Sequence, residues 1–552
     1  MGRLAAVVVV PARDEAERIA SCLRALSRQT LSRDRFAVIV VLDRCRDATA
    51  EVARATAAET GLDLALLTGP GVGVGAARRL GMDAAYDRLL RAHSDRGLIA
   101  CTDADSRPAR DWLERQLAHV AAGAEAIAGL IELDGVERAQ LPEAVLRARR
   151  RDAQARLGQV RAADPGAEHH HAAGASLAVT VETYRRVGGI EPLQALEDSA
   201  FADRLAEHRV ALLRPADVRV RTSARAEGRA PRGLSVDLAV SRWLHERRYR
   251  ASDFTLERLL SLRGRTRVSV IVPARECAET IGGVLTRTVA PMLDAGLVEE
   301  VVVVDAASRD GTAEVARRHG ARVLQQDRLR RDLGPALGKG DAMWRALPQT
   351  RGEVVCFLDA DTADPHPHHL LGLLGPILTE PSIVLVKGAF ARPLRAEGVT
   401  LPDEGGRVTE LMARPLLNLH EPRLAGFRQP LAGEVAARRE LLEAVSFPAG
   451  YGVEIALLID ALRRHGLDAL AECDLGSRQN RHQPLRALGE MAYAVLAAME
   501  RRVAGSPARS EPGRYLRPWD GSLVPVPVVE RPPIASAGRS NRGRRPPLRQ
   551  AA

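Results

Sequence analysis

The sequence predicts an α/β protein with two domains, each holding a mainly parallel sheet covered by helices. Three observations lead to this prediction. Residues 4–15 and 268–279 both read as a β-branched strand that is stopped by a proline and followed by an amphipathic helix pattern. In each half a second strand then ends in an aspartate, and a later strand runs directly into Asp-Ala-Asp. The chain therefore contains a duplication.

The elements follow in the same order in both halves. The second strand covers 37–43 in the first half and 301–305 in the second, and the later strand covers 98–105 and 354–361. Strands that alternate with helices form a parallel sheet with helices on both faces. Ligands bind beyond the carboxyl ends of such strands, so we expect all these aspartates along one rim of each sheet.

The length of 552 residues is sufficient for two or three domains. We expect a first domain over 1–240, an Arg-rich helical connector over 241–265 and a second domain over 266–502. Residues 503–552 are rich in Pro, Gly, Ser and Arg, which predicts an extended, partly disordered tail.

The composition excludes several classes of protein. Apolar residues make up 46% and charged residues 27%, as in globular proteins, and no run of 18 apolar residues is present to span a bilayer. The N-terminal valine run is too short for a secretory signal, so we expect a cytoplasmic protein. Six cysteines are scattered singly, without a CxxC pair, and we expect them to be reduced and mostly buried.

The net charge is +10, but the segment 531–552 alone holds six arginines and no acidic residue. The rest of the chain is nearly neutral, so we predict no nucleic-acid partner. Of 80 basic residues only Lys339 and Lys387 are lysines. We interpret them as positions where a compact ammonium group is needed and a planar guanidinium does not fit.

The Asp-Ala-Asp motifs predict divalent cation sites. Asp103 and Asp105 in the first half, and Asp359 and Asp361 in the second, follow a buried strand directly. Carboxylates in this arrangement can hold Mg²⁺ or Mn²⁺ beside a diphosphate. One such motif recurs by chance, but its presence at equivalent places in both halves strengthens the prediction.

These motifs resemble the nucleotide-sugar glycosyltransferases of the GT-A fold in both halves. In the second half, longer blocks resemble the glucosyl-3-phosphoglycerate synthases. The blocks are GKGDAMWRAL (338–347), FLDADTADPHP (357–367), GGRVTELMARPLLNL (405–419), QPLAGE (429–434) and GYGVEIALLIDAL (450–462). The resemblance implies transfer of glucose from UDP-glucose to 3-phosphoglycerate with retention, using Mg²⁺ or Mn²⁺, by two GT-A domains. The resemblance leaves open whether the protein forms a homodimer.

The same resemblance implies roles for individual residues. Those assigned to the donor are Pro273, Ala274, Glu276, Asp305, Lys339 and Asp359, together with Asp43 in the first half. Asp361 is assigned to the metal. Arg407, Thr409 and Arg478 are assigned to the acceptor, whose phosphate and carboxylate need fixed positive charge and hydroxyl donors. Glu434 is assigned a place close to the reacting sugar, where it orients the sugar or the acceptor hydroxyl.

Two positions depart from the resemblance. Glu276 and Cys277 stand where the synthases have Asn-Glu, so nucleotide contacts at this turn can differ. Asn480 stands in place of the metal-binding histidine of the family. Asn480 is our assigned metal ligand, and His482, assigned to the acceptor side, is the alternative ligand.

The first half resembles family-2 glycosyltransferases without indicating a substrate. Its Glu197-Asp198 pair resembles the pair that carries the catalytic base of inverting enzymes, which makes Asp198 the candidate base. The alternatives are another donor or acceptor, such as GDP-mannose, glycerate, a lipid or a polysaccharide, or a half that is a non-catalytic scaffold.

Overall fold

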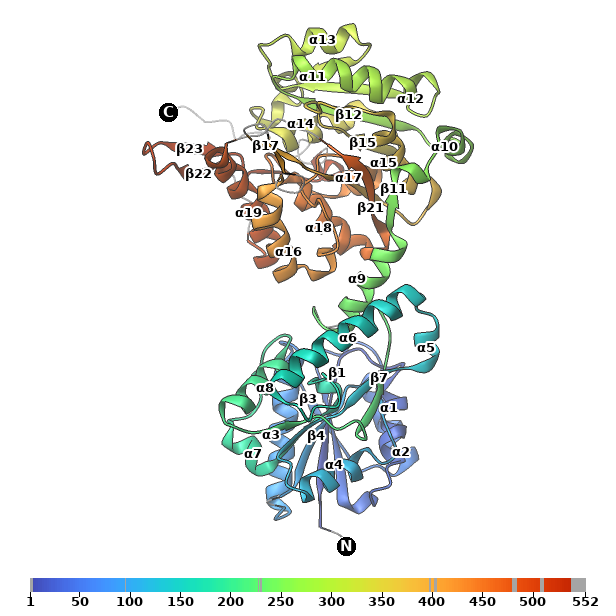
Figure 1. Ribbon diagram of the computed structural model, residues 1–552, viewed down its shortest axis with the longest axis vertical. Helices are drawn as coiled ribbons and strands as arrows, with labels where there is room; N and C mark the ends of the chain where they lie inside the picture. The colour runs from blue at the N-terminus through green and yellow to red at the C-terminus, as the bar shows by residue number, and fades with distance from the viewer. Residues whose placement is uncertain are drawn as a thin grey trace, which may run out of the picture. The chain divides into compact units, whose positions relative to one another are not determined.

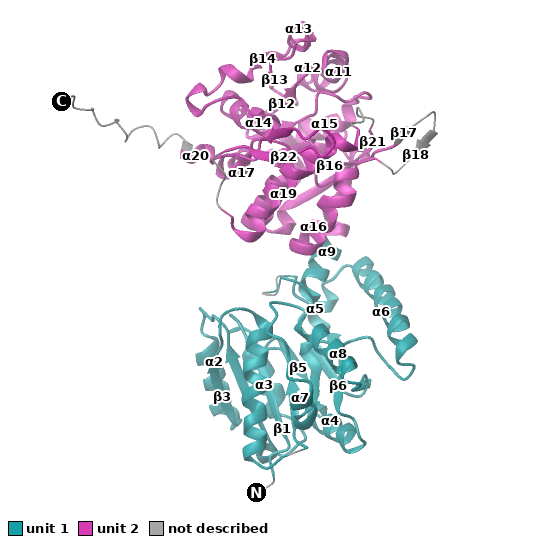
Figure 2. Ribbon diagram, turned by 90° about the vertical axis from the view of Figure 1, so that its left-hand side faces the viewer, with its two compact units in different colours: residues 1–242 teal, residues 243–552 magenta. Residues whose placement is uncertain are grey.

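The computed structural model describes residues 3–94, 96–226, 228, 231–396, 399–401, 405–478, 484–506 and 511–537. The chain divides into two compact units, Met1–Arg242 and Trp243–Ala552 (Figure 2). The division lies two residues beyond the expected end of the first domain. The expected connector, 241–265, lies mostly in unit 2, where its short strand β11 (Arg248–Arg250) pairs in parallel with β21.

Unit 1 contains a seven-stranded sheet in the order β3-β2-β1-β4-β8-β6-β9. These strands are β1 (Ala6–Ala12), β2 (Phe36–Leu42), β3 (Leu64–Thr68), β4 (Leu98–Cys101), β6 (Ala126–Ala128), β8 (Leu177–Thr180) and β9 (Leu212–Leu213). A three-stranded sheet consists of β5 (Ser106–Pro108), β10 (Arg219–Thr222) and β7 (Leu130–Leu133). Strands β1 to β4 pair in parallel, and β8 runs antiparallel to β4 and β6.

Helices cover both faces of this sheet because β1 is buried on both sides. Val8 and Val10 pack in one apolar cluster with α1 and α2, whereas Val7 and Val9 pack in another with α3, α7 and α8 (Figure 1). The helices that lie within unit 1 are α1 (Ile19–Ser27), α2 (Thr49–Thr60), α3 (Val74–Arg91), α4 (Trp112–Ala121), α5 (Gly135–Ala139), α6 (Glu143–Ala163), α7 (Val181–Arg186) and α8 (Glu197–Glu207), and α9 (Leu234–Glu246) contains the boundary between the units. Alternate side chains of one strand therefore supply two cores.

Unit 2 contains an eight-stranded sheet in the order β11-β21-β16-β19-β15-β12-β13-β14. Its further strands are β12 (Val268–Ala274), β13 (Glu300–Asp305), β14 (Arg322–Gln325), β15 (Val354–Phe357), β16 (Leu385–Ala391), β19 (Val435–Arg438) and β21 (Leu470–Ser477). Only β19 runs antiparallel to its neighbours among these paired strands. Three two-stranded pairs are β17 (Leu394–Ala396) with β18 (Val399–Leu401), β20 (Phe447–Pro448) with β24 (Glu530–Arg531), and β22 (Gly513–Leu516) with β23 (Leu523–Val526).

The helices of unit 2 lie between these strands in the chain, except for α20, which follows the last described strand. They are α10 (Leu256–Arg263), α11 (Ala278–Gly283), α12 (Ala290–Asp294), α13 (Thr312–Arg318), α14 (Lys339–Ala346), α15 (Pro367–Thr379), α16 (Arg414–His420), α17 (Arg439–Ala444), α18 (Val453–His465), α19 (Leu488–Ala504) and α20 (Ile534–Ala537). None of the helices formed by the described residues is long and apolar enough to cross a bilayer.

The duplication extends to the hydrogen bonds of the turn after the first strand of each unit. Asp14 and Glu276 both have a φ of 51°, a left-handed conformation that is uncommon outside glycine. The backbone N–H of the next residue donates to a threonine hydroxyl at 2.8 Å in each unit, Thr49 in unit 1 and Thr312 in unit 2. The two turns are therefore equivalent positions of one fold.

The described part of the segment expected to be an extended tail is structured. Strand β24 pairs with β20, and the Trp344 indole donates to the carbonyl of Pro532 at 2.8 Å. Arg531 Nε lies 2.6 Å from Asp341 Oδ1, and Asp341 is fully buried. The composition did not predict this packing, because its cause is one arginine that neutralises a buried carboxylate about 190 residues away in the chain.

Candidate functional site

The rim of the unit 2 sheet brings the predicted donor residues together. Ala274 pairs with Asp305 in the β12–β13 register, which puts the turn from Pro273 to Glu276 beside Asp305. Asp305 is buried, and its Oδ2 accepts a hydrogen bond from Gln325 Nε2 at 2.9 Å. One further hydrogen-bonding partner at this rim, Gln325 at the end of β14, was not predicted from the sequence.

Lys339, the first residue of α14, joins two carboxylates at this rim. Its Nζ lies 2.6 Å from Asp359 Oδ1 and 2.8 Å from Glu454 Oε1. Burial disfavours the charged form of Asp359, but the charges of Lys339 and Arg478 and the hydrogen bond from Lys339 act against burial, and together with the charge of Arg392 they lower the pKa of Asp359 to about 2. Burial likewise lowers the pKa of Lys339, and the two carboxylates raise it above its ordinary value. The centre therefore keeps Lys339 and Asp359 charged.

Glycine is required beside this centre. A Cβ atom at Gly433 would lie 2.1 Å from Asp359 Oδ1 and 2.4 Å from Lys339 Nζ, so any side chain would displace the ion pair. A Cβ atom at Gly340 would lie 1.9 Å from the carbonyl oxygen of Pro448. The glycines around Lys339 thus permit the helix to approach the rim closely.

Asp361 carries the second carboxylate of the pair. Burial, and then the charge of Asp359, raise the pKa of Asp361 above its ordinary value. Two mutually repelling, oxygen-bearing side chains in a buried place fit a hard divalent cation. Within the described ranges no group of three or more His, Cys, Asp or Glu is arranged to hold a metal, and the predicted ligands Asn480 and His482 lie outside those ranges.

Arg478 and Glu434 form a buried pair next to the Asp-Ala-Asp turn. Arg478 follows β21, and its guanidinium contacts the carboxylate of Glu434 and the hydroxyl of Thr362. It also lies 5.2 Å from the centroid of the Phe390 ring. Glu434 directly precedes β19 and is 1% exposed. The guanidinium of Arg478 therefore holds this carboxylate in a charge-assisted ion pair.

The predicted acceptor residues Arg407 and Thr409 share one segment. Thr409 is buried at the start of a π-helical turn, and Arg407 is half-buried. The sequence did not indicate Arg392, whose carbonyl oxygen accepts from Gly405 N at 2.9 Å. Burial lowers the pKa of Arg392, and the charges of Asp359 and Asp361 act against this effect. The acceptor segment and the acidic pair are thereby connected through one further arginine.

Lys387 lies on β16, where it is 1% exposed. Its ammonium donates to the carbonyl oxygen of Ala432, two residues before Glu434. Burial lowers the pKa of Lys387 to about 7 from an ordinary 10.5. The two lysines of the chain therefore serve one site with opposite pKa shifts: Lys339 is held charged and Lys387 is easily neutralised.

The lowered pKa of Lys387 predicts that the stability of the protein depends on pH. Because its folded pKa is depressed, the unfolded chain holds more protons between about pH 7 and 10.5, and stability rises with pH through this window. We expect the free energy of unfolding of the wild type, minus that of Lys387→Met, to rise by up to about 1.4 kcal/mol per pH unit in the window. Urea unfolding at several pH values measures it, and a difference that does not change with pH contradicts the expectation.

Unit 1 has a cavity of about 570 Å³ at the equivalent rim. Arg78 of α3 is buried there, with Nη2 2.9 Å from Asp103 Oδ1 and Nε 3.1 Å from Glu197 Oε1. Its Nη1 donates to the carbonyl of Gly174 at 3.0 Å, and Gly174 N donates to Asp198 Oδ2 at 3.1 Å. Arg78 therefore connects the Asp-Ala-Asp motif of unit 1 with the predicted catalytic pair.

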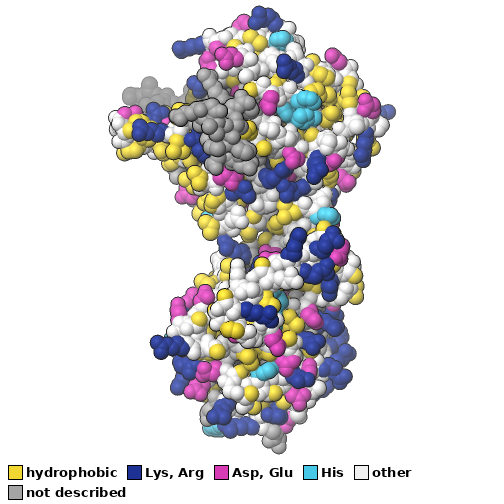
Figure 3. Space-filling model, in the orientation of Figure 1, with side chains coloured by type: hydrophobic (Ala, Val, Ile, Leu, Met, Phe, Trp, Pro, Cys, Tyr) yellow, Lys and Arg dark blue, Asp and Glu magenta, His cyan; other side chains and the backbone are white. Residues whose placement is uncertain are grey.

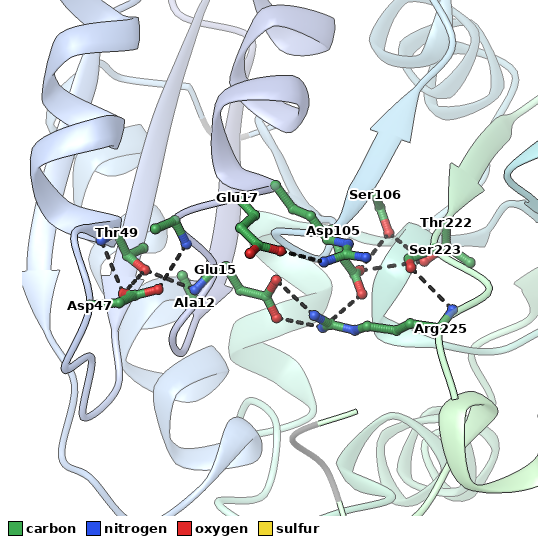
Figure 4. Close-up of polar contacts among 12 residues, drawn as sticks. Ala12, Glu15, Glu17, Asp47, Thr49, Asp105, Ser106, Thr222, Ser223 and Arg225 are labelled. Atoms are coloured by element: carbon green, nitrogen blue, oxygen red, sulfur yellow. Dashed lines mark hydrogen bonds and ion pairs between the residues drawn. The ribbon is translucent and has the colours of Figure 1, made fainter. Parts of the chain in front are cut away.

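The remaining predicted residues of unit 1 also line this cavity. Asp43 Oδ1 accepts a hydrogen bond from Gly71 N at 2.6 Å. Asp105 Oδ2 lies 2.9 Å from Arg225 Nη2, and Arg225 Nη1 donates to Glu15 Oε2 at 3.0 Å (Figure 4). The side chains of Asp103 and Asp105, expected to bind a metal, are thus each paired with an arginine. No local pattern indicates Arg225, because it lies far from Glu15 in the chain.

Charged side chains of both signs are interspersed on the face of each unit that Figure 3 displays.

All six cysteines are free, and Cys22, Cys101, Cys356 and Cys473 are buried.

Comparison with known proteins places this fold in a family. The family description "Glycosyl transferase family 2" matches residues 7–176 and 269–399, just over half of the chain. The glucosyl-3-phosphoglycerate synthase of Mycolicibacterium paratuberculosis is 40% identical over 301 residues, which cover 53% of this chain and 91% of the relative. The synthase of Mycolicibacterium smegmatis is 39% identical, covering 53% and 98%.

Two solved structures are also similar. One is glucosyl-3-phosphoglycerate synthase from Mycobacterium tuberculosis in complex with Mn²⁺, UDP-glucose and phosphoglyceric acid; it is 39% identical, covers 51% of this chain and 95% of its own, and has a TM-score of 0.46. The other is mannosyl-3-phosphoglycerate synthase from Rubrobacter xylanophilus, 43% identical, with coverages of 53% and 98% and a TM-score of 0.48. The chain therefore belongs to glycosyl transferase family 2 and is a hexosyltransferase of the GT-A fold, related over about half of its length to glucosyl-3-phosphoglycerate synthases.

Proposed function

We propose that unit 2 transfers glucose from UDP-glucose to the hydroxyl group of 3-phosphoglycerate with retention of the anomeric configuration. The observation that carries the proposal is the charged centre of Lys339, Asp359 and Glu454 at the sheet rim. It is built from three of the sequence blocks that resemble the synthases, and two synthases are about 40% identical to half of this chain.

The donor would lie along the carboxyl ends of β12, β13 and β15. Asp305 and the turn from Pro273 to Glu276 would contact the nucleoside. Asp359 and Asp361 would hold Mg²⁺ or Mn²⁺, which supplies neutralisation of the leaving diphosphate when bound. Lys339 would fix Asp359 in place and supply positive charge on the donor side.

The acceptor would lie between the Arg407 segment and the buried Arg478. Arg407 and Thr409 would bind its phosphate by charge-assisted and hydroxyl hydrogen bonds. Glu434 would hold the guanidinium of Arg478 in the orientation that the substrates require. Retaining transfer needs no general base, which is consistent with a Glu434 carboxylate that is already paired with an arginine.

The test is to incubate the full chain with UDP-glucose, Mg²⁺ and 3-phosphoglycerate. We expect release of UDP and a glucosylated 3-phosphoglycerate, and we expect Asp361→Asn to lose this activity. GDP-mannose is included as a donor because a mannosyl-3-phosphoglycerate synthase is 43% identical over a match that covers 53% of this chain. No transfer from any common nucleotide sugar would refute the proposal, and preference for GDP-mannose would refute the donor.

Arg407→Ala is expected to raise the KM for 3-phosphoglycerate about 10- to 100-fold, since one charge-assisted hydrogen bond contributes about 1.5–3 kcal/mol. The KM for UDP-glucose should stay unchanged. With glycerate, which lacks the phosphate, wild type and variant should be equally poor. Arg414→Ala removes an exposed arginine paired with Glu410 on the same segment and is the matched control. Equal effects of both variants would contradict the assignment.

We further propose that unit 1 is a second glycosyltransferase domain. The supporting observation is the cavity that Asp43, Asp103 and Asp198 line at the rim equivalent to that of unit 2. Asp198 would accept the proton of the acceptor hydroxyl in an inverting reaction.

A further inference from the structure

Both units contain the same arrangement of one basic side chain and two carboxylates, but the basic residue differs. The members are Lys339, Asp359 and Glu454 in unit 2 and Arg78, Asp103 and Glu197 in unit 1. In each unit, the basic residue lies on the helix before the Asp-Ala-Asp strand and joins the first aspartate to a glutamate in the first turn of a later helix. The first aspartate of each motif is therefore neutralised in the same manner.

The two units differ at the second aspartate. In unit 1, Arg225 forms an ion pair with both Asp105 and Glu15, and the side chains of Arg225, Asp105 and Glu15 are 16%, 16% and 8% exposed. Figure 4 shows the guanidinium of Arg225 between these two carboxylates. In unit 2, the position of Glu15 is occupied by Cys277, because each residue follows the left-handed residue of its turn. At this position of the turn, unit 2 thus has a thiol where unit 1 has the carboxylate that holds Arg225.

The chain position of Arg225 strengthens this difference. Arg225 follows the last residue of β10, Thr222, by three residues, and Asn480 follows the last residue of β21, Ser477, by three residues. Strand β10 is the last strand of unit 1, and β21 is the last strand along the chain in the eight-stranded sheet of unit 2. Asn480 is the residue assigned to the metal from the sequence. Counted along the chain from these strands, unit 1 therefore has an arginine at the position where unit 2 has its assigned metal ligand.

We propose that the guanidinium of Arg225 replaces the divalent cation in unit 1, so that the cavity of unit 1 binds a nucleoside diphosphate without Mg²⁺ or Mn²⁺. This inference rests on the proposal that unit 1 is a glycosyltransferase domain. Asp105 does not fit a metal, because Arg225 Nη2 lies 2.9 Å from its Oδ2 and Glu15 holds the same guanidinium in place. Arginine presents several N–H donors in one plane, which match phosphate oxygens, and Glu15 and Asp105 orient this plane.

Binding of Mn²⁺ by the full chain tests whether Arg225 replaces the divalent cation in unit 1. In Mn²⁺ titrations followed by electron paramagnetic resonance, Asp105→Asn should bind as much Mn²⁺ as the wild type. Arg225→Asn, which imitates unit 2, should bind one additional Mn²⁺ per chain, and Asp105→Asn in the same chain should remove it. Because each count is read against the wild type, the result does not depend on the site in unit 2. A loss of Mn²⁺ in Asp105→Asn overturns the inference, as does a folded Arg225→Asn that gains none.

Nucleotide binding tests whether the cavity of unit 1 holds a nucleoside diphosphate without a metal. In the Asp361→Asn background, which weakens the proposed site of unit 2, binding of UDP and GDP is measured by equilibrium dialysis in EDTA and in Mg²⁺. We expect one of these probes to bind equally in both buffers, and Arg225→Asn to weaken its binding in EDTA at least about tenfold. Binding that requires Mg²⁺, or no binding of either probe, overturns the inference. A normal product assay with the wild-type chain alongside either result leaves the function proposed for unit 2 intact, so the two failures are distinguishable.

Discussion

Lys339→Met is expected to lower glucosyl transfer by unit 2 about 10²- to 10³-fold, the cost of removing one preorganised electrostatic group from an active site. The substitution leaves the carboxylates of Asp359 and Glu454 facing each other without the ammonium that lies within 2.8 Å of both. Their uncompensated charge repels the diphosphate of the donor. Turnover per folded protein measures the effect, with folding followed by circular dichroism.

Lys339→Arg keeps the positive charge, so it tests whether the shape of the ammonium group matters as well. The ammonium lies within 2.8 Å of both Asp359 and Glu454, so the larger, planar guanidinium does not fit between them without displacing one of the carboxylates. We therefore expect Lys339→Arg to lower glucosyl transfer by unit 2 as well. Arg317→Met removes an exposed arginine paired with Glu314 and is the control. Turnover close to that of the wild type in either Lys339 variant would contradict the role of the centre.

Asp341→Asn is expected to destabilise unit 2 by about 3–5 kcal/mol, the cost of breaking a buried ion pair. Asp341 is fully buried and pairs with Arg345 at 2.9 Å and with Arg531 at 2.6 Å. The substitution leaves two buried guanidinium groups without their carboxylate. Unit 2 spans Trp243–Ala552, and for a unit of this size we expect a fall in melting temperature of about 5–8 °C. Differential scanning calorimetry measures it.

Two variants distinguish the buried cluster from a surface effect. Arg531→Ala should destabilise unit 2 less than Asp341→Asn, since Arg345 still neutralises Asp341. Asp332→Asn, which removes an exposed carboxylate paired with Arg330, should leave the melting temperature within about 1 °C. The interpretation would be wrong if Asp332→Asn and Asp341→Asn had equal effects.

Features encoded in short stretches of sequence were predictable. The β-branched runs that become β1 and β12 are apolar at nearly every position because both faces of the sheet are covered, and this pattern is local. Asp305 and Asp359 come at the ends of strands, so the parallel topology alone puts them on one rim. Lys339 was singled out by its rarity, and the structure places it between two carboxylates.

Contacts between distant residues could not be predicted in this way. Glu454 lies in a block that was recognised from the sequence, but only the fold brings its carboxylate to Lys339. Arg225 and Glu15 are separated by 210 residues, and Arg531 and Asp341 by 190. In a chain with 78 arginines, no local pattern distinguishes the few that neutralise buried carboxylates. The glycine of the Gln429–Glu434 block shows the same limit, because its requirement arises from a neighbouring ion pair.

The most direct test of the central claim follows the sugar itself. The full chain is mixed with UDP-glucose carrying ¹³C at the anomeric carbon, 3-phosphoglycerate and Mg²⁺, and the label is observed by NMR. We predict that the label moves into a phosphorylated glucosylglycerate with the α configuration of the donor, and that Asp361→Asn leaves it in UDP-glucose. Label that stays in UDP-glucose with the wild type, or that reaches a product equally well with Asp361→Asn, would contradict the account.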